Sequence, residues 1–198
     1  LVPSSEVEMV LQESIDETRR LFSIQWEPTK HTSVKAHPNI VRKSLLSAVT
    51  ATAAQSLGVA IHLLETTISY VKEREQFGKP IGSFQAIKHL LADVQVQIEF
   101  AKPVVYRAAY SLAHNLPGRY RDVSHAKLSA SRAARLAAKN SIQAHGAIGY
   151  TWESDLQIYM KRIWVLDIMW GNHSWHQNRL EEEILNTRSE LGLGQTFI

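Results

Sequence analysis

The chain has 198 residues, enough for one well-cored domain but too few for two large ones. Its formal net charge is only +3, and the 22 lysines and arginines are interspersed with 19 aspartates and glutamates, which does not favour nucleic acid as a partner. Cysteine is absent, so disulfides, thiolate catalysis and cysteine zinc sites are excluded. We expect a soluble, cytoplasmic protein without a membrane span.

The first part of the chain is expected to be one helix and a connection. Residues 4–22, SSEVEMVLQESIDETRRLF, carry apolar side chains at near-helical spacing after two serines that suit a helix cap. Residues 23–38 contain two prolines and show no period, which is typical of an irregular connection. We therefore treat residues 1–37 as separate from a second domain, residues 38–198.

The second domain is predicted to consist of long helices. Apolar residues recur at helical spacing, and no useful β-alternation is evident anywhere in the chain. Asn115–Gly118 forms a turn, Gly171 ends one helix, and Pro103 is expected to kink another. The predicted helices are 39–73, 83–114, 122–144, 153–170 and 174–187. This pattern predicts an all-α fold, an antiparallel bundle of long helices.

Two loops between these helices carry residues suited to a ligand. The first, REQFGKPIG at residues 74–82, has an arginine that can hold a phosphate and a phenylalanine that can flank a planar ring. The second, QAHGAIGYTWE at residues 143–153, has two glycines that let backbone amides approach a ligand. Taken separately, each could equally be a plain connection between helices.

Taken together, the two loops resemble motifs of the acyl-CoA dehydrogenases. The family patterns are R-x-x-F-G-x-P-I-x-x-F-Q and Q-x-h-G-G-x-G-Y-T-x-E, where h is apolar or histidine, and this chain matches them at nearly every defined position. The resemblance covers residues 38–187 and departs from the second pattern at Ala147, where the family has a glycine.

The resemblance implies that the chain contacts FAD. By analogy, Arg74 and Phe77 touch a flavin held mainly by a neighbouring subunit, and Gln143 and Gly146 reach the pyrophosphate and adenosine side of that flavin. The remaining predicted cofactor contacts are Gln85, a looser expectation, and His145, which is a candidate to contact a ligand phosphate. No metal site is expected, because His173 and His176 have no carboxylate or cysteine partner and are taken as polar histidines on a helix surface.

The family's catalytic base has no counterpart in the sequence. Acyl-CoA dehydrogenases remove the α-proton of the thioester with a glutamate, and the resemblance puts Trp170 or Gly171 at its position. In a minority of members the base comes from the first long helix, where this chain has Ala48 flanked by Ser47 and Val49. Asp167 is the only carboxylate within one turn of Trp170, and it stays open as an alternative base.

These observations predict a subunit of an FAD-dependent acyl-CoA dehydrogenase whose homologous partner supplies the glutamate and holds most of the acyl-CoA. A heterotetramer is expected, as in the bacterial branch that oxidises CoA thioesters of steroid side chains. Two alternatives remain: a self-sufficient dehydrogenase that uses Asp167, and a helical scaffold without flavin. Family members are about twice as long, and whether the chain is a truncation or lacks a middle portion stays open.

Overall fold

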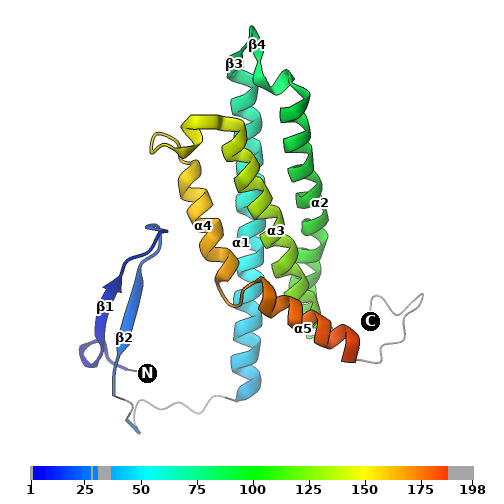
Figure 1. Ribbon diagram of the computed structural model, residues 1–198. Helices are drawn as coiled ribbons and strands as arrows, with labels where there is room; N and C mark the ends of the chain where they lie inside the picture. Colours follow the sequence, from blue (N-terminus) through cyan, green and yellow to red (C-terminus); the bar gives the residue numbers. More distant parts are fainter. Residues whose placement is uncertain (1, 28, 31–36, 187–198) are drawn as a thin grey trace.

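The computed structural model describes residues 2–27, 29–30 and 37–186 and confirms the all-α bundle. The described residues form five α-helices, which are α1 (Pro38–Glu73), α2 (Gln85–Ala113), α3 (Arg119–His145), α4 (Leu156–Ile168) and α5 (His173–Asn186). Figure 1 shows that α1 to α4 run alternately up and down while α5 crosses one end of the bundle. α2 continues through Pro103. α4 is shorter than predicted, so Trp170 lies beyond its end.

The centre of the bundle is α3, which packs against α1, α2, α4 and α5. Its buried faces include many alanines with little or no exposed area, and a side chain this small lets another helix backbone come close. These residues are Ala126, Ala130, Ala133, Ala134 and Ala137. The alanine-rich sequence thus serves close helix packing as well as helix propensity.

α1 carries buried hydroxyl groups that are satisfied within the helix. The hydroxyls of Thr52, Ser56 and Thr67 donate to carbonyl oxygens one turn earlier, at 2.8, 2.9 and 2.7 Å. Gly58 does not break the helix, and a Cβ added there would meet nothing within 4 Å.

The length and apolar composition of α1 would suffice for a membrane crossing. Core helices of soluble proteins share these properties, and α1 packs along α2 and α3. The absence of a membrane span therefore stays a prediction.

The predicted helix at residues 4–22 is wrong. The segment forms a short 3-10 turn, η1 (Ser4–Glu6), and then an antiparallel hairpin of β1 (Glu8–Gln12) and β2 (Leu21–Gln25) beside α4 (Figure 1). Buried Asp16, 1% exposed, holds the hairpin to α4 through an ion pair between its Oδ2 and Nε of Arg162 at 3.1 Å. Arg162 also donates to Thr18, and Arg19 contacts the sulfur of Met169 at 2.9 Å.

We expect Arg162→Ala to release the hairpin from the bundle. The substitution leaves the buried carboxylate of Asp16 without its cation, which typically costs about 3 to 5 kcal/mol unless the segment detaches. Hydrogen exchange should therefore speed up over residues 8–25 while α1 and α3 stay protected. Adding Asp16→Asn removes the unpaired charge and should restore part of the protection. Unchanged exchange in Arg162→Ala would mean that other contacts hold the hairpin.

Candidate functional site

The loop after α1 is a small hairpin that projects from one end of the bundle (Figure 1). Its strands are β3 (Glu75–Gln76) and β4 (Lys79–Pro80), followed by η2 (Ile81–Ser83). The backbone of Ile81 donates to the carbonyl of Arg74 at 2.8 Å and closes the loop. Phe77 and Gly78 form the turn with φ of 56° and 76°, the positive values required by the tight turns that suit a two-residue hairpin.

Phe77 is an unusual residue for this turn. A left-handed backbone costs a residue with a Cβ about 1 to 2 kcal/mol, and asparagine or aspartate would fit better. Phe77 is 92% exposed, and its ring lies nearly perpendicular to that of Phe84, with ring centroids 6.2 Å apart. A strained backbone and a bare aromatic ring at a tip are features of a residue placed for an external ligand or partner.

Arg74 and Gln85 flank the hairpin and have free polar groups. Arg74 is the C-terminal cap residue of α1, and its exposed side chain has no ion pair with any described residue. Gln85 is the exposed first residue of α2. Both can therefore contact an anionic or polar group beyond the end of the bundle.

The second loop begins where α3 ends. Gly146 has φ 67° and ψ −140°, a combination open essentially to glycine, and it leads into η3 (Gly146–Tyr150). Gly149 is needed for space, because an added Cβ would lie 3.2 Å from the carbonyl oxygen of Ile142. Ala147 has an ordinary negative φ and is exposed, so the alanine fits. Gln143 is exposed on the last turn of α3.

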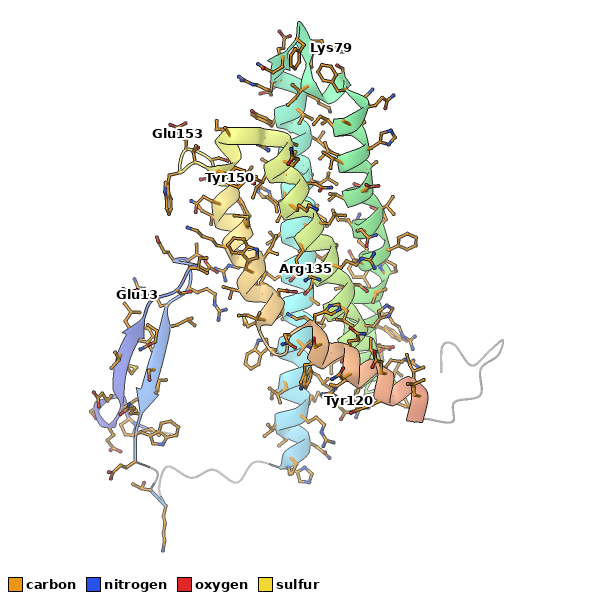
Figure 2. All side chains as sticks on the ribbon, viewed as in Figure 1. Glu13, Lys79, Tyr120, Arg135, Tyr150 and Glu153 are labelled. Atoms are coloured by element: carbon orange, nitrogen blue, oxygen red, sulfur yellow. The ribbon has the colours of Figure 1, made fainter. Side chains whose placement is uncertain are left out.

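A ring stack that the sequence did not reveal joins the two loops. Tyr70, one turn before Arg74, stacks on His145 with ring centroids 4.0 Å apart and an angle of 18°. Nδ1 of His145 lies 2.8 Å from the carbonyl oxygen of Ser141, so it must donate. Burial lowers the pKa of His145, against the effect of this hydrogen bond, and the neutral ring keeps Nε2 as an acceptor. Figure 2 shows Lys79 on the first loop and Tyr150 and Glu153 on the second, at the same end of the bundle.

The position of the expected base lies in the turn from α4 to α5. Trp170 has φ 60° and is 46% exposed, and Gly171 has φ 110°. An added Cβ at Gly171 would lie 2.6 Å from the ring of Trp175, so only glycine fits. Trp170 and Gly171 line a cavity of about 270 Å³. At the alternative base position, Ala48 and its neighbours Ser47 and Val49 offer no carboxylate.

Asp167 faces α3 rather than this cavity. Its carboxylate pairs with Arg135 at 3.7 Å and lies near the buried amine of Lys127, which donates to the carbonyl of Leu166. Burial lowers the pKa of Lys127 to about 8, and the charge of Asp167 opposes that shift. Asp167 is therefore part of a partly buried polar contact between α3 and α4.

The prediction that His176 is a surface histidine is wrong. His176 is 1% exposed, and its Nδ1 lies 3.2 Å from the hydroxyl of Ser124 on α3, whereas His173 is exposed as predicted. Burial lowers the pKa of His176 to about 4, and the positive charges of Lys127 and Arg179 also lower it. A backbone hydrogen bond with Trp170 raises this pKa and so opposes the shift. The described residues contain no group of three metal-ligating side chains.

The buried His176 should make stability depend on pH. Its pKa falls from 6.5 in the unfolded chain to about 4 in the fold, so the unfolded state takes up a proton first as pH drops. This contribution to stability is complete above pH 6.5 and is lost toward pH 4, by about 3 kcal/mol in total. Urea unfolding at pH 7 and pH 5 should show a smaller pH effect in His176→Gln than in the unchanged chain. Equal effects would mean that His176 is not held neutral.

The chain is similar to known proteins of one family. The model of the "Acyl-CoA dehydrogenase, C-terminal domain" family matches residues 39–185. The chain is 40% identical over 149 residues to acyl-CoA dehydrogenase IpdE2 of Mycobacterium tuberculosis, covering 75% of this chain and 43% of the relative.

Solved structures with the same fold include butyryl-CoA dehydrogenase of Megasphaera elsdenii, with a TM-score of 0.83 and 26% identity over 91% of this chain and 49% of that one. A variant of the Tcur3481-Tcur3483 steroid ACAD has a TM-score of 0.81 and 27% identity over 91% and 49%. The chain thus spans about half the length of its relatives or less. The matched residues, the helical bundle and the two loops show that the chain belongs to the acyl-CoA dehydrogenase family, whose C-terminal domain it contains.

Proposed function

We propose that the chain is a subunit of a two-chain, FAD-dependent acyl-CoA dehydrogenase. It contributes contacts to a flavin held mainly by a homologous partner, and the partner supplies the base that removes the α-proton of the CoA thioester. Members of the family are FAD-dependent flavoproteins, and the observation that carries the proposal is the separation of two sites within this chain.

The two loops and the base position lie far apart along α1. The cavity beside Trp170 involves Leu46 near the start of this helix, whereas Arg74 follows its end, 28 residues later. At 1.5 Å per residue the separation is roughly 40 Å, longer than an extended FAD molecule. One flavin therefore cannot use both places, which supports a flavin that is shared with a neighbouring chain.

The residues at the loop end fit a flavin nucleotide. Arg74 offers an unpaired guanidinium for a phosphate, Phe77 offers a bare ring face, and Nε2 of neutral His145 offers an acceptor. A Cβ added at Gly146 would meet nothing within 4 Å, so the space beside its backbone is open for a close approach. Gln85 and Gln143 are exposed at the same end and can add hydrogen bonds.

The chemistry of the bound FAD is to accept the hydride that leaves the β-carbon of the substrate. This chain's own residues bind and orient the cofactor, and they offer no proton acceptor at the base position, because an indole N–H only donates. A base must come within hydrogen-bond reach of the proton it removes, and Asp167 faces α3 beside Arg135 and Lys127. Asp167 is therefore a weaker candidate for the base than a carboxylate of the partner.

A flavin-free scaffold is the remaining alternative. A scaffold does not explain why Phe77 is strained and exposed or why Arg74 is unpaired, whereas contacts to a shared flavin explain both. The two-chain name of the Tcur3481-Tcur3483 steroid ACAD supports a heteromeric assembly and a bulky steroid acyl group as the substrate. We propose an assembly of two copies of each chain.

Arg74→Ala should weaken FAD retention more than it weakens folding. A charge-assisted contact to phosphate contributes about 1.5 to 3 kcal/mol, equivalent to about a ten- to hundredfold loss of affinity. Flavin absorbance of the purified complex after dilution and gel filtration measures the retention. Arg132→Ala, which removes an exposed arginine of α3, is the matched control. Equal flavin retention in the two variants would remove Arg74 from the site.

Asp167→Asn should leave turnover per bound flavin nearly unchanged. Loss of the charge beside buried Lys127 should lower the melting temperature, because the ammonium group loses its nearest anion. Steady-state turnover of the complex with an acyl-CoA distinguishes these effects. Loss of a general base lowers the rate by about a hundredfold or more, and such a loss with flavin still bound would make Asp167 the base.

A further inference from the structure

The outer face of α2 carries a stripe of exposed apolar side chains. α2 packs on α1 and α3, and Figure 1 shows it at the side of the bundle away from α4 and the β1–β2 hairpin. The stripe consists of four side chains that are between 48% and 71% exposed: Val96, Phe100, Tyr106 and Tyr110. Exposed apolar residues are ordinary when they are scattered singly, but a contiguous stripe along one helix marks an interaction surface.

The stripe is symmetric about Pro103. Phe100 and Tyr106 stand three residues to either side of this proline, and Val96 and Tyr110 stand seven residues to either side. At about 100° per residue, all four side chains lie within about 60° of the direction of Pro103, so they share one face of the helix. Pro103 is itself exposed, and its ring projects less than the side chains around it because it is bonded back to the backbone. The stripe is therefore lowest at its centre.

This symmetry matches a second copy of the same helix that runs in the opposite direction. In an antiparallel pair with a two-fold axis at Pro103, residues equally far from the proline on its two sides face each other. Val96 of one copy then packs on Tyr110 of the other, and Phe100 packs on Tyr106, so each contact occurs twice. Aromatic pairs of this kind stabilise an interface beyond the area that they bury.

The charges beside the stripe favour the same antiparallel direction. Glu99 and Arg107 lie four residues to either side of Pro103, so each glutamate comes opposite an arginine of the other copy. In a parallel pair the same two residues would face their own kind, and like charges repel. Among the described residues Arg107 uses its Nε for Asp122, at 3.0 Å, which leaves its terminal nitrogens for the second copy.

We propose that α2 pairs with α2 of a second copy of this chain, antiparallel and centred on Pro103. The pairing goes beyond the proposed dehydrogenase function, because it requires neither flavin nor acyl-CoA and joins two copies of this chain to each other. Gln85, the α2 residue predicted to contact the flavin, lies roughly 16 Å along the helix from Val96, so the two surfaces are separate.

Introduced cysteines test the register, because the chain has no cysteine of its own. Pro103→Cys places a thiol at the proposed two-fold axis, so a short bis-maleimide should join two copies of the chain. Val96→Cys alone should give little product, because its two thiols would lie roughly 21 Å apart. Val96→Cys combined with Tyr110→Cys should link again, since each new cysteine faces the other. The products are measured on a denaturing gel, with the chain in the form in which it is isolated.

Other patterns of cross-links would overturn the proposal. If Val96→Cys links to itself as strongly as Pro103→Cys, the pair is parallel. If neither Pro103→Cys nor the double variant links, no second copy lies on the stripe. Circular dichroism checks the fold of each variant, and the double variant, which keeps Pro103, decides if Pro103→Cys does not fold.

A charge on the stripe should weaken the association. We expect Phe100→Glu to raise the dissociation constant about tenfold or more, because the carboxylate would be buried against Tyr106 of the other copy. Ala109→Glu is the matched control, since Ala109 is exposed on α2 but lies about 120° from Pro103. Sedimentation velocity at several concentrations gives both constants, and equal values, or no association of the unchanged chain, would contradict the pairing. These measurements require neither flavin nor turnover, so their failure is distinguishable from failure of the proposed dehydrogenase function.

Discussion

The close approach of α1 and α2 to the alanine face of α3 is the contact on which the rest of the structure depends. Ala126, Ala133 and Ala137 have no exposed area, and any larger side chain there would push the neighbouring helices apart. The packing also fixes how far each helix extends past the others. It brings the ends of α1 and α3 together, so that Tyr70 stacks on His145 and the two loops keep a fixed relation.

Polar side chains of α3 hold α4 and α5 in place at the other end of the bundle. Ser124 and Lys127 lie on the face toward α4 and α5, where they engage His176 and the carbonyl of Leu166. A buried ammonium group tolerates few alternative packings, because every other arrangement leaves it without an acceptor. These contacts hold the turn that carries Trp170 and Gly171, and with it the wall of the cavity.

The sequence predicted the long helices and both loops because their signals are local: helical spacing in the bundle and glycines that need positive φ in the loops. The β1–β2 hairpin was missed because its side chains are exposed on both faces, so no alternation marks it, and because Arg162, far along the chain, holds it through Asp16. The burial of His176 depends in the same way on a distant partner, Ser124. Spacing within one helix cannot reveal such contacts.

The exposed ring of Phe77 affects how long the protein persists in the cell. A bare aromatic side chain on a projecting hairpin is a feature that chaperones and quality-control proteases recognise. A copy without a partner would therefore be removed faster than an assembled one. If a partner chain covers Phe77, as proposed, the cellular amount of this chain would follow the supply of that partner, without any regulation of its own synthesis.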